Sequence, residues 1–244
     1  MIEAFPPAHL LAAVLVLALA YLVRGIAGFG SGLIAIPLLA LILPLPVVVP
    51  VIAVLDLLAS ASHGIGNRRG IQWKEILYLL PFSILGITAA VFLLKNLDPE
   101  LMTKGLAAFI LMYSLYTLSA QNTSPAASRL WALPSGGIGG LVNTMIGTGG
   151  PFYVIYLKLR GLGKAELRVT IATILLLDGT SRVISYTAAG LFSKTALIMV
   201  AAGIPLGALA LYVGGQIQTN MSQKLFQQAI SALLLMSGVA LLLK

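Results

Sequence analysis

Two glycine-rich interruptions of apolar segments constrain the fold of this chain more than any other feature. They read Gly28-Phe29-Gly30-Ser31-Gly32 and Gly147-Thr148-Gly149-Gly150-Pro151, and they occupy matching places in the two halves. Glycine frees the backbone and proline removes a hydrogen-bond donor, so a regular helix should not continue through either stretch. At membrane depth, such a break is tolerated only where protein or a water-filled cavity surrounds it. Paired breaks of this kind point to the substrate site of a secondary transporter.

The composition predicts a polytopic protein of the cell membrane. Of the 244 residues, 59% are hydrophobic and only 9% are charged, whereas soluble domains carry about 25% charged residues. The chain has no cysteine, and its two histidines belong to no cluster of acidic residues, so we expect neither disulfides nor a metal or cofactor. The net charge of +8 indicates orientation in the bilayer and not a nucleic-acid partner.

The apolar pattern predicts five helical segments in each half. A helix needs about 20 apolar residues to span a bilayer. The segments after the breaks, 33–43 and 152–159, are too short to span, so we expect half-length helices that begin at the breaks. The other predicted segments are 8–25, 47–65, 75–94, 100–120, 133–146, 165–189, 195–216 and 222–243.

Recurring landmarks predict an internal repeat. The expected organisation is a first transmembrane repeat over 1–121, a linker over 122–130 and a second repeat over 131–244. Three pairs of residues recur at nearly the same offset: Gly28 with Gly147, Asp56 with Asp178, and Gly86 with Gly207. The fold class is therefore an all-α membrane bundle of two repeats with broken segments at the glycine motifs.

The odd number of segments in each half predicts that the repeats are inverted. One set of loops then holds most of the basic residues, and the positive-inside rule makes that side cytoplasmic. Both termini are consequently predicted to lie outside. The cytoplasmic set is Arg68, Arg69, Lys74, Arg129, Lys158, Arg160, Lys164, Arg168 and Lys224, against Lys95, Lys104, Lys194 and Lys244 outside.

Two carboxylates lie inside predicted membrane helices. A carboxylate at the centre of such a helix costs about 2.5–3.5 kcal/mol on insertion scales, so it normally faces the bundle interior. We assign Asp56, Asp178 and Arg182 to coupling or gating, with either carboxylate as a proton carrier. The structural alternative is an ion pair, since Asp178 and Arg182 are four residues apart on one helix face. Arg24 is the corresponding long-range partner for Asp56.

The breaks also predict an anion site. The N-termini of the two half-length helices carry free N–H groups and the positive end of the helix dipole. Arg24 adds a cation, and Ser31, Asn143, Thr144 and Thr148 add side-chain donors. This combination suits a small oxyanion bound between the two breaks. The alternative is that the glycines only allow close helix packing, as small-xxx-small patterns do.

Both break regions resemble a known family. Residues 24–37 (RGIAGFGSGLIAIP) resemble the first-repeat signature of the TauE/SafE sulfite-exporter family, also called toluene sulfonate uptake permeases. Residues 140–151 (GLVNTMIGTGGP) resemble its second-repeat signature. The resemblance implies export or uptake of sulfite, sulfonates or related anions. Carried over by position, it points to Gly28, Gly30, Ser31, Gly32, Asn143, Thr144, Gly147, Thr148, Gly149 and Gly150.

The function predicted from the residues is a permease for small anions that works by alternating access, with proton coupling as an additional hypothesis, and the resemblance implies that these anions contain sulfur. Arg24 and Phe29 complete the set of substrate-binding candidates. A passive anion channel and a permease for a different small organic anion are the alternatives. An enzyme is not expected, because the chain has neither a Ser/His/Asp arrangement nor a Walker loop; an accessory subunit stays open. Besides lipid, a homodimer is one assembly that the sequence allows.

Overall fold

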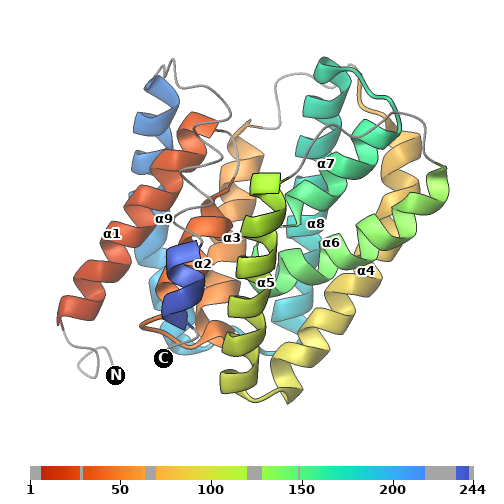
Figure 1. Cartoon of the computed structure of the whole chain (residues 1–244). Coiled ribbons are helices and arrows are strands. Elements are labelled where there is room, and N and C mark those ends of the chain that lie inside the picture. Colours follow the sequence, from red (N-terminus) through yellow and green to blue (C-terminus); the bar gives the residue numbers. More distant parts are fainter. Residues whose placement is uncertain are drawn as a thin grey trace. The chain divides into compact units, whose positions relative to one another are not determined.

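The computed structural model describes residues 7–27, 30–63, 70–119, 128–147, 149–217 and 235–241, and all regular structure in them is helical (Figure 1). The first half contains α1 (Pro7–Ala27), α2 (Ser31–Ala40), α3 (Leu45–His63), α4 (Trp73–Asn96) and α5 (Pro99–Ser119). The second half contains a 3-10 turn η2 (Arg129–Trp131), α6 (Ala132–Ile146), α7 (Gly150–Leu159), α8 (Lys164–Ala188) and α9 (Lys194–Gln216). Residues 235–241 are also helical.

The predicted all-α class is confirmed, and so are the positions of the nine predicted helical segments that lie in the described residues. The last predicted segment, 222–243, falls largely outside the described residues. The half-length helices α2 and α7 begin two residues earlier than expected, at Ser31 and Gly150. The first turn of a helix needs no partners for its N–H groups and tolerates proline. Ser31, Gly32, Gly150 and Pro151 therefore lie in a first helical turn and not in the break itself.

Three helices are long and apolar enough to cross a membrane, counted over the described residues alone: Trp73–Asn96, Val169–Ala188 and Lys194–Gln216. They also expose large apolar side chains, such as Leu85 and Phe92 on α4 and Leu209 on α9. Contiguous exposed apolar surface on a water-soluble monomer is rare. These faces are therefore suited to contact with lipid.

The helices form two compact units. Unit 1 comprises Met1–Leu55, Leu97–Ala120 and Phe192–Lys244, and unit 2 comprises Asp56–Asn96 and Gln121–Leu191. Within unit 1, α9 packs along α1, and within unit 2, α4 packs along α6 (Figure 1). Each unit thus contains helices from both sequence halves. The repeat boundaries stay a prediction, because a repeat is defined by duplicated sequence and not by contacts.

Glycines bring the backbones of these helix pairs into direct contact. In unit 1, a Cβ added to Gly214 would lie 2.2 Å from the Leu22 carbonyl oxygen. In unit 2, a Cβ added to Gly140 would lie 2.2 Å from the Ser83 carbonyl oxygen, and one added to Gly86 would lie 2.1 Å from that of Gly137. Small residues permit such close approach in membrane proteins. The packing role that the sequence suggested for small residues therefore applies to these positions.

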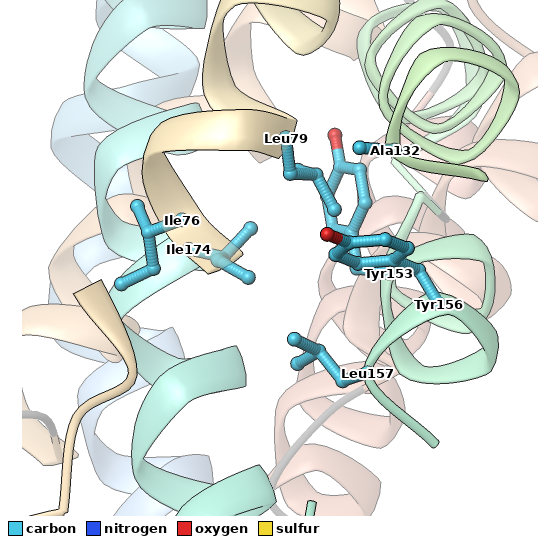
Figure 2. Close-up of a cluster of buried hydrophobic side chains, with 7 residues drawn as sticks. All are labelled: Ile76, Leu79, Ala132, Tyr153, Tyr156, Leu157 and Ile174. Carbon is cyan, nitrogen blue, oxygen red and sulfur yellow. The ribbon is translucent and has the colours of Figure 1, made fainter. Parts of the chain in front are cut away.

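The apolar core of unit 2 surrounds α7. Tyr153, Tyr156 and Leu157 of this short helix are fully buried. Figure 2 shows them with the other members of the cluster, which come from α4, α6 and α8: Ile76, Leu79, Ala132 and Ile174. The two tyrosine hydroxyls donate to two different buried carboxylates, Asp178 and Glu75. The core therefore holds α7 between two polar clusters.

Candidate functional site

The second glycine break is closed by one asparagine side chain. Helix α6 ends at Ile146, and Gly147 adopts a left-handed φ of 73° that glycine tolerates. The Gly149 N–H donates to Asn143 Oδ1 at 3.1 Å, across the break. A Cβ on Gly149 would lie 2.3 Å from the Gly139 carbonyl oxygen, so this glycine also serves packing. Asn143 thus ties the end of α6 to the start of α7.

Asp178 of α8 is fully buried and is held by three neutral donors. The donors are the Asn143 side-chain amide, the Ser83 hydroxyl and, at 2.7 Å, the Tyr153 hydroxyl. They come from α6, α4 and α7, so one carboxylate connects four helices of unit 2. Buried charges normally require such hydrogen bonds. We call Ser83, Asn143, Tyr153 and Asp178 the Asp178 cluster.

Arg182 lies one turn after Asp178 on α8 and is only 2% exposed. The ion pair suggested by their spacing is absent from the described residues, because the Asp178 oxygens accept from the three neutral donors instead. Asp178 and Asp56 still attract the guanidinium electrostatically. Its Nε and Nη2 atoms are buried and have no hydrogen-bond partner among the described residues. Arg182 is therefore a buried cation with two open donor positions.

Thr144 supplies a further open position near Arg182. Its side chain is fully buried, and its Oγ1 has no hydrogen-bond partner in the described part of the chain. The Tyr186 hydroxyl donates to the Thr144 carbonyl oxygen, and the Arg182 guanidinium lies 6.0 Å from the centre of the Tyr186 ring. Thr144 and Arg182 therefore both contact Tyr186, directly beside the Asp178 cluster.

The first break has a corresponding construction in unit 1. Gly30 has φ 98° immediately before α2, and no described atom lies within 4 Å of a Cβ built there. This glycine is required for backbone conformation and not for packing. Arg24 Nη1 donates to Ser31 Oγ at 2.8 Å, with both side chains buried. Arg24 precedes Gly28 by four positions, as Asn143 precedes Gly147, and each side chain reaches across its own break.

The predicted site residues fall into two groups. Unit 1 holds Arg24, Gly30, Ser31 and Gly32, and unit 2 holds Asp56, Asn143, Thr144, Gly147, Gly149, Gly150, Asp178 and Arg182. Gly28, Phe29 and Thr148 lie outside the described residues.

Sequence reasoning missed Ser83, Tyr153 and Tyr186. A signal existed for Tyr186, because Asp178, Arg182 and Tyr186 recur every four residues and share one face of α8. Tyr153 follows the second break by only a few residues. Ser83 had no local signal, since its role depends on the packing of α4 against α6.

Glu75 forms a second polar cluster in unit 2. It is buried at the start of α4 and accepts from the Tyr156 hydroxyl at 2.6 Å. Arg160 Nε and Arg129 Nε lie 3.2 and 3.4 Å from its oxygens. These contacts fix η2 and the end of α7 to α4. Among the described residues, this cluster included, no group of three or more His, Cys, Asp or Glu side chains is placed to hold a metal ion.

Comparison with known proteins identifies the family. A curated relative, the "Probable inner membrane transporter protein TsaS" of Comamonas testosteroni, is 24% identical over 194 residues, which cover 78% of this chain and 80% of the relative. No solved structure matches the chain. The family model "Sulfite exporter TauE/SafE" matches residues 13–241, almost the whole sequence. The chain therefore belongs to the TauE/SafE sulfite exporter family, as its break motifs indicated, and is a multi-pass membrane transporter and not an enzyme.

Proposed function

We propose that the protein is a secondary transporter for small sulfur-containing anions such as sulfite or organosulfonates. The observation that supports this most directly is the buried Arg182 with two open donors beside a helix break. A buried cation without a hydrogen-bonded carboxylate partner favours an anionic ligand. The family takes its name from sulfite export, which supports the sulfur-containing class.

Each break has groups that are suited to anion binding. Helices α2 and α7 start at Ser31 and Gly150, and the residues around both starts are buried or half-buried. Helix N-termini attract anions through free N–H groups and the helix dipole. The Gly149 N–H is already taken by Asn143. The later N–H groups of the first turn of α7 are therefore the better candidates for contact with substrate.

Alternating access would arise from two inverted repeats that move relative to each other. Matching contacts support this proposal. Gly86 of α4 packs on α6, and its landmark partner Gly207 of α9 packs on α1, against the ring of Tyr21. The side chains of Arg24 and Asn143 also each form a hydrogen bond across their own break, Arg24 as a donor to Ser31 Oγ and Asn143 as an acceptor from the Gly149 N–H. Proteins of opposite repeat orientation often move in this way, with the site fixed near the centre.

Asp178 is the stronger of the two candidates for proton coupling. As a carboxylate it accepts from three helices at once. A protonated Asp178 would lose part of its acceptor capacity and loosen Asn143, which also holds the start of α7. Proton binding at Asp178 would thereby change the second break. Asp56 would act with it through their shared attraction to Arg182.

Uptake of labelled sulfite into proteoliposomes tests the proposed function. Flux is measured with and without an imposed pH gradient, against empty liposomes and against liposomes with Asp178→Asn. For the wild type, we expect saturable flux that changes with the pH gradient. For the variant, we expect flux that is the same with and without the gradient. Flux that never saturates and ignores the gradient would indicate a passive channel. Flux of other organic anions with none of sulfite or sulfonates would refute the sulfur-containing class.

A homodimer stays part of the proposal. The mass of the purified protein in nanodiscs, measured by light scattering, tests this assembly, and a monomeric mass would refute it.

A further inference from the structure

We propose that the transported anion binds with two oxygens on the Nε and Nη2 atoms of Arg182 and a third oxygen on the Thr144 hydroxyl. This assigns Arg182 to substrate binding, whereas its sequence position suggested coupling or gating. The inference rests on the proposed function, because it takes the substrate to be an oxyanion. It adds a definite binding geometry and a preference among anion classes.

The open donors of Arg182 have the right arrangement. Nε and Nη2 form one edge of the planar guanidinium, and their N–H bonds run parallel. This edge matches two oxygens of one acid group, which accept from it in a bidentate manner. Nearly all buried polar atoms in proteins have partners, so unpartnered buried donors call for an explanation. An anion on this edge supplies two acceptors and compensates the charge.

The neighbouring carboxylates do not fill this role. Asp178 attracts Arg182, but its oxygens are engaged by Ser83, Asn143 and Tyr153. Asp56 contributes attraction to Arg182 as well, yet Nε and Nη2 have no hydrogen-bond partner in the described residues. The two carboxylates therefore stabilise the charge of the buried guanidinium and leave its edge open for ligand.

Thr144 gives the site its preference for three-oxygen head groups. Its Oγ1 has no hydrogen-bond partner in the described residues, its backbone carbonyl accepts from the Tyr186 hydroxyl, and the Arg182 guanidinium lies 6.0 Å from the centre of the same Tyr186 ring. The Tyr186 hydroxyl fixes the backbone of Thr144, so Tyr186 is a positioning residue. Sulfite and sulfonates offer a third oxygen to the threonine hydroxyl, whereas a carboxylate has only two. The site should accordingly favour sulfite and methanesulfonate over acetate.

Titration calorimetry on the purified full-length protein tests this geometry, with sodium sulfite, methanesulfonate and acetate as probes. Arg182→Lys keeps the positive charge but removes the paired donors, and should raise the Kd for sulfite by about tenfold to a hundredfold. Thr144→Val keeps the shape but removes the hydroxyl. It should raise the Kd for sulfite and methanesulfonate by about tenfold and leave that for acetate nearly unchanged.

Matched controls separate binding from folding. Arg129→Lys changes an arginine of the Glu75 cluster, and Thr173→Val removes a hydroxyl on α8 that bonds the Val169 carbonyl. Both should bind sulfite like the wild type, and all variants are checked for an unchanged melting temperature. If Arg182→Lys does not fold, a normally folded Thr144→Val protein still tests the proposal.

The outcomes distinguish the two proposals. Wild-type affinity for sulfite in both Arg182→Lys and Thr144→Val would overturn the binding geometry while leaving sulfite transport intact. Binding of acetate that depends on Arg182, without binding of sulfite or methanesulfonate, would refute the sulfur-containing class and the three-oxygen preference but support the arginine edge. A wild type that binds none of the three probes would overturn both.

Discussion

Substituting Gly140 by alanine should separate α4 from α6. The added Cβ would lie 2.2 Å from the Ser83 carbonyl oxygen and 2.9 Å from the Ser83 Cα, whereas ordinary contact begins at 3.4 Å. The nearest atoms belong to backbone, so no side chain can rotate away and the helices must part by roughly 1 Å. Overpacking of this kind costs about 1–3 kcal/mol, and a rigid neighbour favours the upper part of that range.

A matched control lies on the same helix. No described atom lies within 4 Å of a Cβ built on Gly137. Gly137→Ala should therefore stabilise the protein by about 0.5–1 kcal/mol, because alanine has a higher helix propensity than glycine. After the same gain is subtracted for Gly140→Ala, that variant should lose about 1–2 kcal/mol net. At about 2–4 °C per kcal/mol, we expect Gly140→Ala to melt about 2–8 °C below the wild type and Gly137→Ala about 1–4 °C above it.

Intrinsic tryptophan fluorescence during heating is the assay. The chain has two tryptophans, and both report on this helix pair: Trp73 begins α4, and Trp131 directly precedes α6. Because the Ser83 side chain also donates to Asp178, the displacement should reach the Asp178 cluster. If Gly140→Ala melts at or above Gly137→Ala, backbone contact does not set the distance between these helices and the reasoning fails.

Three further predictions concern the polar clusters and the orientation. Glu75→Gln should lower the free energy of unfolding by about 1–3 kcal/mol, since it weakens partly buried hydrogen bonds from two arginines; Glu100→Gln, whose ion pair is exposed, should leave the melting temperature unchanged, and equal shifts would contradict this. Asn143→Leu removes one of the three donors of the buried Asp178 carboxylate and leaves the Gly149 N–H without its partner, so it should cost about 2–6 kcal/mol and speed hydrogen exchange in the first turn of α7; unchanged exchange there would show that the amide is dispensable. In the cysteine-free chain, an impermeant maleimide should label Lys95→Cys but not Lys74→Cys in intact cells, and the reverse pattern would invert the predicted orientation.

The helices were predictable because their signals are local. Lengths of apolar sequence and the glycine breaks placed α1 to α9 within a few residues, and the break motifs identified the family. The two half-length helices start two residues earlier than predicted, at Ser31 and Gly150, and α2 ends three residues earlier, at Ala40. A helix start can include glycine and proline, since its first N–H groups need no partners.

The candidate site was only partly predictable because it depends on contacts between helices. Asn143, Asp178 and Arg182 could be singled out as polar residues in apolar segments. The spacing of Asp178 and Arg182 suggested an ion pair, but helical spacing only permits such a pair. Hydroxyl and amide donors from three other helices compete for the carboxylate, and the position of Ser83 among them follows from the packing of α4 on α6.

Helix α4 of the first sequence half belongs to unit 2, and helix α9 of the second half belongs to unit 1. This arrangement has a consequence for biosynthesis. Chains emerge from the ribosome N-terminus first, and domains generally fold in that order. Helix α4 is synthesised before α6, the helix it packs against. Helix α1 lacks its neighbour α9 until nearly the whole chain has been synthesised. During synthesis, the helix faces that carry Gly25 on α1 and Gly86 on α4 are therefore exposed before the helices that cover them have been made. Neither half completes a compact unit alone, so a truncated first half should be a substrate for membrane quality control and not a stable fragment.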